Sequence, residues 1–399
     1  MATSGGPNII NDGLVFGYDI GYPVADNTQA LRFSKGEPTT NLVVNPDFSS
    51  GDLTGWSSTS TSNSQVDING VSIENGYYYF HKKCTSTGAG SHDRLYQSST
   101  YELDTSLKTT VTIDIWINPS NAYTLSFYGL GSTADDTTYN EKPLSSNSSV
   151  VTTIDLGGGW TRYIYTLQTG WYTGSGNAFR VAVYPGWSGR GFMEYKVKRV
   201  QVEQKPHATP FVNGTRSATE GLKDFTSNNT IDLSTVSFDS NAQMEFDGTD
   251  DKIDITTNFG TLNAYTFEYV AYANSTHNMP ISSRTSTAFY KYGAYSWRYT
   301  HGGVGSEFYH TSGNGTGWAH YAITYDGSVI TVWENGISKG TRASTGTADF
   351  TGGIRIGSWS SAASYTWDGT IPIMKMYNKA LTAEEVQSNY NGIRSRFGI

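Results

Sequence analysis

A two-residue alternation of apolar and polar side chains is the sequence feature that most constrains the fold of this chain. In residues 110–118, TVTIDIWIN, every second residue from Val111 to Ile117 is a branched apolar residue, and Thr112, Asp114 and Trp116 stand between them. The same alternation recurs in YTLSFYGL, WTRYIYTL, AFRVAVYP and FMEYKVKRVQVE. Successive side chains of a β-strand point to opposite faces, so the pattern predicts a series of strands that each bury one face. A two-sheet jelly roll is the expected arrangement of such strands.

The composition favours the same fold class. The 399 residues include 44 glycines, 28 tyrosines and 10 tryptophans, and long stretches of helix-forming residues are missing. Many short strands joined by glycine-rich turns suit this composition. We therefore predict an all-β protein, and the length allows two or three domains.

Charge and apolar patterning disfavour several classes of function. The chain has 27 Lys and Arg against 35 Asp and Glu, so it lacks the basic stripe that neutralises phosphates, and we expect no nucleic-acid partner. No stretch approaches the ~18 apolar residues of a membrane-spanning segment, and we expect no membrane insertion. Cys84 is the one cysteine, which excludes an intramolecular disulfide and a multi-cysteine zinc site.

The strand and turn patterns divide the chain into three parts. We expect an N-terminal arm over residues 1–38, a jelly-roll β-sandwich over 39–212 and a second β-sandwich over 213–399. In the third part, the dipeptides at 326–327 (Asp-Gly) and 335–336 (Asn-Gly) predict type I′ hairpin turns, because both central residues of such a turn need positive φ.

One short C-terminal helix is predicted over residues 381–392. Thr382 and Glu385 form a capping box at its start, and Val386 and Tyr390 share one face. Gly392 is the expected stop.

The middle part resembles the jelly-roll carbohydrate-binding modules of the galactose-binding-like group. The resemblance rests on NLVVNPDFSSGDLTGW, TIDIWINPSNAYTLSFYG and VQVEQKPHATPFV. Such modules often close on a pair of acids that helps to hold a structural calcium, whereas this chain has Lys196, Lys198 and Arg199 in that region. The resemblance implies sugar binding, but it does not predict that calcium site.

The third part resembles the concanavalin A-like, laminin-G-like lectin and glucanase sandwich. The resemblance rests on MEFDGTDDKIDI, YTFEYVAYAN, WAHYAITYDGSVITVWENG, IRIGSW and DGTIPIMKMYNKALTAEEVQSNYN. In such sandwiches an N-terminal strand often belongs to the same domain. We therefore predict that the strand GLVFGYD, residues 13–19, joins the C-terminal sandwich and that the jelly roll is inserted between them.

The order of these motifs along the whole chain resembles structural proteins of marine tailed phages, especially those that infect cyanobacteria. The resemblance implies a virion surface protein, such as a head decoration, a fibre or a tail appendage. The N-terminal MATSGGPNIINDG lacks the features of a secretory signal, so we expect assembly in the host cytoplasm and a final place on the exterior of the particle. The expected partners are other virion proteins, copies of the same chain in a homo-oligomer, with a trimer as our guess, and a host surface glycan.

The acidic stretch MEFDGTDDKIDI, residues 244–255, admits three interpretations. Sandwich glucanases place their nucleophile and acid/base on one strand as ExDxE or ExDxxE; Glu245 and Asp247 begin such a motif, but Thr249 or Asp250 stands where the second glutamate belongs. Gly248 favours a hairpin turn, so we assign no catalytic residue and expect the protein not to be an enzyme. No cofactor or metal ligand is assigned, although a loose structural calcium site at this loop stays open.

Aromatic side chains in glycine-rich loops are the candidates for sugar binding, because a flat ring can stack on a pyranose. The jelly roll offers Trp171, Tyr172 and Trp187, and the second sandwich offers Trp359, Tyr365 and Trp367. The alternative is that these residues plug the ends of the sandwiches or lie in a subunit interface. A purely architectural adaptor and a polysaccharide depolymerase remain the alternative functions.

Overall fold

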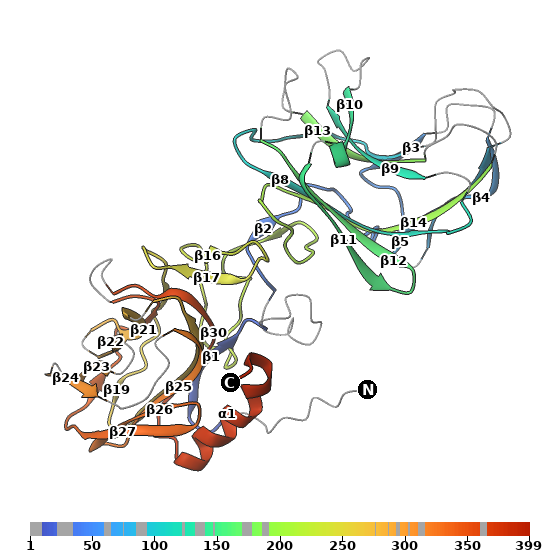
Figure 1. Cartoon of the computed structure of the whole chain (residues 1–399). Helices are drawn as coiled ribbons and strands as arrows, with labels where there is room; N and C mark the ends of the chain where they lie inside the picture. Colours follow the sequence, from blue (N-terminus) through green and yellow to red (C-terminus); the bar gives the residue numbers. More distant parts are fainter. Residues whose placement is uncertain are drawn as a thin grey trace. The chain divides into compact units, whose positions relative to one another are not determined.

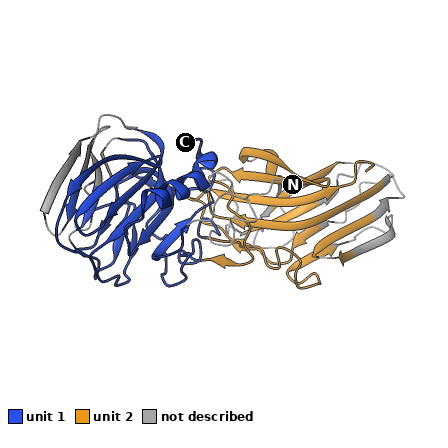
Figure 2. Cartoon of the chain, turned by 90° about the horizontal axis from the view of Figure 1, so that it is seen from below, with its two compact units in different colours: residues 1–38, 217–399 blue, residues 39–216 orange. Residues whose placement is uncertain are grey.

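The computed structural model describes residues 10–21, 35–59, 65–74, 76–84, 94–121, 124–131, 140–146, 148–169, 178–185, 191–275, 277–285, 287–292, 296–301, 304–309, 316–359 and 365–399. Strands dominate these residues, and one α-helix lies near the C-terminus (Figure 1), which confirms the predicted all-β fold. Residues 1–38 and 217–399 form unit 1, and residues 39–216 form unit 2 (Figure 2).

Unit 1 is built from two antiparallel sheets. The larger sheet has the order β16 (Ser237–Phe238), β17 (Met244–Asp247), β30 (Asp368–Tyr377), β20 (Tyr265–Ala273), β25 (Gly317–Tyr325), β26 (Val329–Glu334) and β27 (Ile337–Ala343), with β1 (Leu14–Asp19) also beside β30. The smaller sheet has the order β18 (Ile253–Ile255), β29 (Ile354–Ile356), β21 (His277–Ser283), β22 (Ala288–Tyr292), β23 (Ser296–His301) and β24 (Val304–Tyr309). A short pair, β19 (Thr261–Leu262) and β28 (Ala348–Asp349), lies outside both. The core lies between the sheets, because Phe267 and Tyr269 of the larger sheet share one buried cluster with Ile281 and Phe289 of the smaller one.

The strand β1 brings the N-terminal part of the chain into the larger sheet. It pairs antiparallel with β30, and its Phe16 and Tyr18 are fully buried in the core of unit 1. Near the C-terminus, the guanidinium of Arg396 donates to both carboxylate oxygens of Asp19, at 2.7 and 2.5 Å. Residues from both ends of the chain therefore complete one sandwich.

Unit 2 also has two antiparallel sheets. One has the order β10 (Asn140–Pro143), β9 (Leu125–Gly131), β13 (Ala178–Pro185), β6 (Arg94–Gln97) and β3 (Trp56–Thr59), with β7 (Tyr101–Glu102) beside β13. The other has the order β11 (Ser148–Gly157), β12 (Trp160–Leu167), β8 (Thr109–Ile117), β14 (Gly191–Glu203), β5 (Tyr77–Cys84) and β4 (Gln65–Glu74), and a 3-10 turn, η2 (Leu144–Ser146), precedes β11. As the alternation predicts, Val111, Ile113 and Ile115 of β8 are fully buried in the core of this unit.

The two ends of unit 2 lie beside each other. The short strands β2 (Thr39–Thr40) and β15 (Thr215–Arg216) pair, so unit 2 extends to Arg216, beyond the predicted boundary after residue 212.

Asn41 also connects the opening and closing segments of unit 2. Its amide nitrogen donates to the carbonyl oxygens of Val200 and Val212, both at 3.1 Å, and its amide oxygen accepts from the N–H groups of Val43 and Val202 at 3.1 and 3.0 Å. Asn41 is buried, and all four of these hydrogen bonds would be lost with its side chain.

The two predicted hairpin turns differ. Asn335 and Gly336, between β26 and β27, have φ of 51° and 74°, so the predicted type I′ turn is confirmed. Between β25 and β26 the prediction is wrong, because Gly327 has a φ of 102° whereas Asp326 is not in the left-handed region. The Asp326 carboxylate instead accepts from the N–H of Ser328 at 2.8 Å, which favours a longer turn closed by the side chain.

The helix α1 (Ala383–Phe397) begins where the sequence predicts and ends later. The capping box of Thr382 and Glu385 is confirmed, but the predicted stop at Gly392 is wrong. Gly398, with a φ of 69°, caps the helix instead. The last turn continues because Ile393 and Phe397 pack on the outer face of the larger sheet, and this burial outweighs the ~1 kcal/mol cost of a glycine inside a helix. The described part of the chain contains no helix with the length and apolarity needed to cross a membrane.

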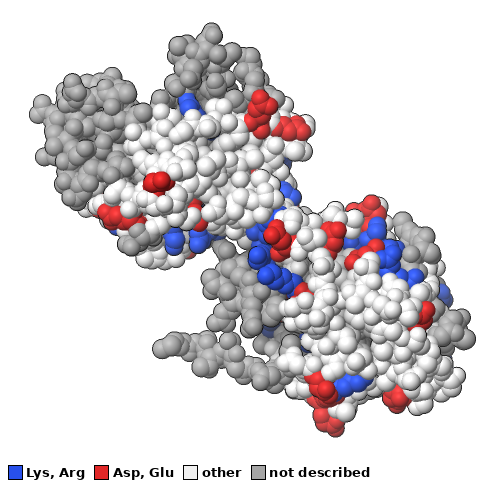
Figure 3. Space-filling view, turned by 180° about the vertical axis from the view of Figure 1, so that it is seen from behind, with Lys and Arg blue, Asp and Glu red and all other residues white. Residues whose placement is uncertain are grey.

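Charged side chains of both signs are scattered over the face drawn in Figure 3. Lys and Arg lie among Asp and Glu there, with uncharged residues between them.

Candidate functional site

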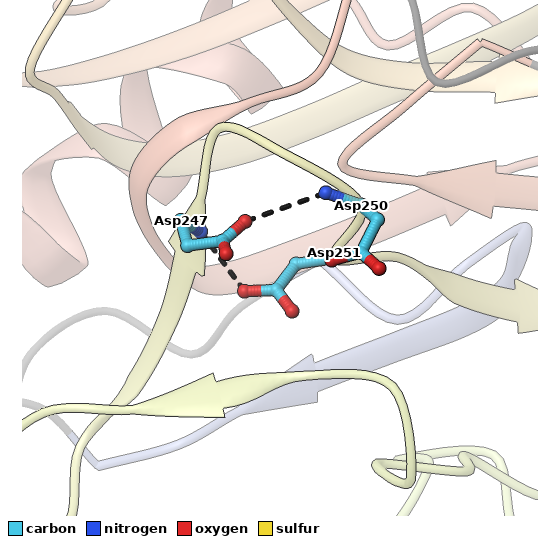
Figure 4. Close-up of side chains that lie close together, drawn as sticks. All are labelled: Asp247, Asp250 and Asp251. Atoms are coloured by element: carbon cyan, nitrogen blue, oxygen red, sulfur yellow. Dashed lines mark hydrogen bonds between the residues drawn. The ribbon is translucent and has the colours of Figure 1, made fainter.

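The acidic turn, residues 247–251, connects the two sheets of unit 1 (Figure 4). It follows β17 of the larger sheet and precedes β18 of the smaller sheet, so the prediction that it forms a hairpin tip is wrong. The reason is burial on both sides of the turn: Phe246 and Ile253 are each fully buried in the same core, and the chain must cross from one sheet to the other to place both there. Gly248, with a φ of 76°, allows the sharp change of direction.

Hydrogen bonds within the acidic turn hold its carboxylates in place. The N–H of Asp247 donates to Oδ2 of Asp251 at 2.9 Å, and Oδ1 of Asp247 accepts from the N–H of Thr249 at 2.7 Å and more weakly from that of Asp250 at 3.4 Å. Asp251 is 5% exposed and also accepts from the N–H and the hydroxyl of Ser237. The carboxylates therefore serve the turn itself.

Negative charge accumulates around this turn. Burial raises the pKa of Glu245, and the charges of Asp239, Asp368, Asp251 and Asp247 raise that pKa further. Burial likewise raises the pKa of Asp251, against its hydrogen bonds. An added positive charge would therefore be favourable here.

Three carboxylates of the turn could contribute to a cation site. Single oxygens of Asp247, Asp250 and Asp251 lie within 4.8 Å of one another. Such oxygens suit calcium, which takes about six to eight ligands, so solvent or a bound molecule would have to supply the others.

The loop before β30 lies against the acidic turn. The hydroxyl of Thr366 donates to the carbonyl oxygen of Gly248, and Nδ2 of Asn274 donates to Oδ1 of Asp368 at 3.0 Å. Tyr365, in the same loop, is 51% exposed and has a φ of 63°. This end of unit 1 therefore combines an exposed phenol, an amide and several carboxylates.

The glucanase-like spacing ends with β17. Met244 and Phe246 point into the core, so Glu245 and Asp247 share the opposite face of the strand. Thr249 and Asp250 lie in the turn beyond the end of β17 and do not extend that face.

The aromatic residues predicted to bind sugar differ in their exposure to solvent. Trp367 is fully buried in the core of unit 1, so the prediction that it stacks on a sugar is wrong. Trp359 is half-buried against Met279 and Ala288, and Tyr365 is exposed. Three further candidates lie outside the described residues: Trp171, Tyr172 and Trp187.

A group of aromatic side chains on the outer face of unit 2 forms a second candidate surface. We call Tyr77, Tyr79, Trp116, Trp160 and Lys196 the aromatic cluster. All five are partly exposed, and they come from β5, β8, β12 and β14. The Lys196 Nζ lies 5.0 Å from the ring centroids of Trp116 and Tyr79 and 5.3 Å from that of Tyr77. The rings of Tyr77 and Trp160 are 6.0 Å apart, edge to face.

Strand register brings these residues together. Trp160 lies opposite Trp116, Trp116 opposite Lys196, and Lys196 opposite Tyr79. Directly opposite residues of antiparallel strands point to the same face, so the cluster follows from pairing between segments far apart in the sequence.

Polar groups border the aromatic cluster. The Tyr79 hydroxyl donates to Oε1 of Glu194 at 2.8 Å, and Nδ2 of Asn118 donates to Oε2 at 2.6 Å. Burial alone would raise the pKa of Glu194, but these two hydrogen bonds and the charges of His81 and Lys196 lower it below its ordinary value. The carboxylate is therefore ionised and fixed in orientation beside the rings.

The alternation of side chains along the strands is the sequence feature from which this cluster could have been predicted. Trp116 lies on the polar side of the 110–118 pattern, the side of Thr112 and Asp114. The run GYYYF, residues 76–80, forms a strand whose Tyr78 and Phe80 are buried, while its alternate tyrosines join the cluster. A strand with aromatic residues on both faces therefore indicates a buried face and an aromatic outer face.

Beneath α1, unit 1 contains a buried charged network. Glu268 accepts from Lys375 Nζ at 3.1 Å and from Asn389 Nδ2 at 2.7 Å, and its other oxygen lies 2.8 Å from Nε2 of His320. Tyr377 also donates to Glu268, at 3.3 Å. Each of these five side chains belongs to a residue no more than 1% exposed, so the network anchors the helix and offers no surface to a ligand.

Comparison with known proteins gives a family match over part of the chain. Residues 247–387 match the concanavalin A-like lectin/glucanases superfamily. No curated protein matches the chain.

Three solved structures illustrate a distant similarity. The native heptameric SAP-like pentraxin from Limulus polyphemus is 16% identical with a TM-score of 0.32, over 36% of this chain and 78% of that one. Domain 4 of an extracellular arabinanase from Geobacillus stearothermophilus, solved with arabinotriose, is 16% identical with a TM-score of 0.33, over 44% of this chain and 93% of that one. The binding domain of Paraclostridial Mosquitocidal Protein 1 is 12% identical with a TM-score of 0.33, over 42% of this chain and about half, 49%, of that one. These three similarities carry no argument about function.

Proposed function

We propose that this chain is a non-enzymatic carbohydrate-binding protein on the outer surface of a virus particle, where it contacts a host polysaccharide. The observation that carries the binding proposal is the aromatic cluster of unit 2, because partly exposed rings beside fixed polar groups are what sugar recognition needs. The match of residues 247–387 to a lectin and glucanase superfamily supports the same class of function.

Each part of the cluster has a defined task in this proposal. The rings of Trp116, Trp160 and Tyr79 offer apolar faces to a pyranose, and the ionised Glu194 and the amide of Asn118 bind its hydroxyl groups. Each Glu194 oxygen can accept a second hydrogen bond, and a sugar hydroxyl can donate it. Because Lys196 lies among the rings, an acidic saccharide is expected to bind more tightly than a neutral one.

The place on a virus particle rests on the sequence. The order of motifs resembles phage structural proteins, and a head decoration, a fibre and a tail appendage are all compatible with that order. In this proposal the partners are other virion proteins and further copies of the chain.

A binding experiment tests the sugar proposal. Trp116→Ala and Tyr79→Ala should each weaken binding to host polysaccharide at least tenfold on a glycan array, while circular dichroism and the thermal midpoint show that unit 2 is folded. Tyr272→Ala is the matched control, because Tyr272 is a partly exposed aromatic residue of unit 1, 37% exposed. Unchanged binding by both cluster variants would contradict the proposed site, and binding lost instead in Tyr365→Ala would move the site to the acidic end of unit 1.

The architectural alternative has its own outcome in the same assay. If the wild-type chain binds no host glycan yet is incorporated into particles, the sandwiches serve as adaptors between virion proteins.

A depolymerase is the second candidate, and one observation favours it. Burial and the surrounding carboxylates raise the pKa of Glu245, and Asp247 lies on the same face of β17. Two neighbouring carboxyl groups in unlike environments are the pattern that glycoside hydrolysis uses. Release of reducing ends from host polysaccharide, abolished in Glu245→Gln, would establish that activity; we expect no release from the wild-type protein.

A further inference from the structure

The strand β11 is an open edge in unit 2. It is the last strand of its sheet and, among the described residues, pairs only with β12 (Figure 1). Its pairing with β12 is regular from Val150 to Asp155, and register shifts lie at both ends of that stretch. The outward N–H and C=O groups of such a strand form a template for another strand.

The side chains of β11 are exposed on both faces. Four large apolar residues contribute: Val150 and Val151 are each 49% exposed, Ile154 is 42% exposed and Leu156 is 40% exposed. Consecutive residues point to opposite faces, so apolar surface is available on both sides of the strand. A long exposed apolar edge of this kind is disfavoured in a protein that acts alone.

Other sheet edges of the molecule carry protection that β11 lacks. The strand β27, at one edge of the larger sheet of unit 1, includes Lys339 and Arg342. The strand β4, at the opposite edge of the β11 sheet, contains Glu74 and a register shift in its middle. In β11 the single charged residue is Asp155, near the end of the strand.

We propose that β11 pairs with β11 of a second copy of this chain, antiparallel across a twofold axis at Thr152. Thr152 then lies opposite Thr152 of the second copy, Val150 opposite Ile154, and Val151 opposite Thr153. β-Branched cross-strand neighbours of this kind stabilise a sheet. The two sheets join into one continuous sheet, and the apolar residues of both faces gain neighbours.

The position of Asp155 favours this register over the next one that the alternation of faces allows. With the axis at Thr152, Asp155 lies opposite Ser149, whose hydroxyl can donate to the carboxylate. With the axis at Thr153, Asp155 would lie opposite the apolar Val151. In both registers the two acids stay apart, so the strand can face a second copy of itself. The sequence of β11 is therefore complementary to itself, and the twofold gives a dimer, where the sequence alone had suggested a trimer.

The proposed contact between two copies of β11 is small, so we expect weak association. β11 has ten residues, whereas a stable interface uses about 20–30 residues a side. We expect a dissociation constant in the micromolar range for the free protein, and tighter association where copies are held together on a particle.

Disulfide trapping tests the register in the full-length chain carrying Cys84→Ser. Thr152→Cys should crosslink with itself under mild oxidation, whereas Val150→Cys and Ile154→Cys should crosslink when mixed and much less when alone. Thr152→Cys that stays monomeric, or equal crosslinking by all three variants, would overturn the register.

Sedimentation velocity from about 1 to 200 μM tests the contact without cysteines. The wild-type chain should shift from monomer to dimer, and Val150→Lys with Ile154→Lys should stay monomeric, because each lysine then faces another lysine. The control is Ile337→Lys on β27, where Ile337 is 63% exposed; it should dimerise like the wild type. A wild-type chain that is monomeric throughout, or a dimer unaffected by the double substitution, would overturn the proposal.

Discussion

At the scale of single residues, Glu268 shows how a buried charge can fix an element in place. Burial alone would raise the pKa of this carboxyl group, but Lys375 and the hydrogen bond with His320 lower it to about 2. Because Asn389 of α1 donates to the same carboxylate, the charge also attaches the helix to the sheet.

The depressed pKa of Glu268 predicts the acid sensitivity of unit 1. An unfolded glutamate has a pKa of ~4.3. The ionised Glu268 therefore contributes about 3 kcal/mol to the stability of unit 1. This contribution is fully present above the unfolded pKa and is lost as the pH falls toward 2. Glu268→Gln alone should cost about 3–5 kcal/mol, because Lys375 keeps a buried unpaired charge. Urea unfolding at pH 7, 4 and 2.5 measures both effects.

The matched control for Glu268 removes both charges. Glu268→Gln with Lys375→Met should recover much of the lost stability and should show a weaker dependence on pH between 4 and 2.5. An unchanged pH dependence in this double variant would assign the acid sensitivity to other carboxylates.

The acidic turn predicts the opposite dependence of stability on pH. Glu245 and Asp251 have raised pKa values when folded, so their ionisation disfavours the folded state, and protonation as the pH falls relieves it. Glu245→Gln should therefore raise the stability of unit 1 near pH 7, by less than about 1 kcal/mol because this carboxylate is partly exposed. A lower thermal midpoint for this variant would contradict the repulsion.

Calcium distinguishes the two interpretations of the same turn. If the carboxylates hold a cation, millimolar calcium should raise the thermal midpoint of unit 1, and Asp250→Asn should abolish the rise. If they serve only the turn, calcium should leave the midpoint unchanged in both proteins.

At the scale of elements, β1 is the strand by which the N-terminal arm stabilises unit 1. It covers one edge of β30 and places Phe16 and Tyr18 in the core. Deletion of residues 1–24 should lower the thermal midpoint of unit 1 by 10 °C or more, or prevent its folding, because two buried aromatic side chains cost about 3–5 kcal/mol each. Unit 2 is the internal reference, and unchanged melting of unit 1 would contradict the role of β1.

The elements also show which features the local sequence can predict. The alternation from Val111 to Ile117 predicts β8 and its buried face, and Thr382 with Glu385 predicts the start of α1. The end of α1 depends on Ile393 and Phe397 packing on a distant sheet, and no local signal at Gly392 reveals that contact.

At the scale of the whole molecule, the chain leaves unit 1 and returns to it at neighbouring points of that unit. β2 pairs with β15, and the N–H groups of Lys35 and Gly36 donate to the carbonyl oxygen of Gly221. The two chain ends of unit 1 at this point are therefore neighbours.

This closeness predicts that unit 2 can be removed. Replacing residues 39–216 by a short Gly-Ser linker should leave unit 1 folded with its thermal midpoint within a few degrees, since a short loop closes at small entropic cost. Differential scanning calorimetry of this protein and of residues 39–216 alone should reproduce the transitions of the full chain. Failure of unit 1 to fold without unit 2 would contradict the prediction.

The amino-acid sequence by itself determined the all-β class, the strands with their buried residues, the start of the helix and the Asn335-Gly336 turn. These features depend on neighbours within a few residues, where alternation, capping and turn chemistry act. The tertiary structure decided that Asp247–Asp251 crosses between sheets, that Trp367 is buried, and that Trp116, Tyr79 and Lys196 meet on one face. Each of these outcomes depends on which distant strands pair and in which register, and that choice is made by the burial of the whole core rather than by any local stretch.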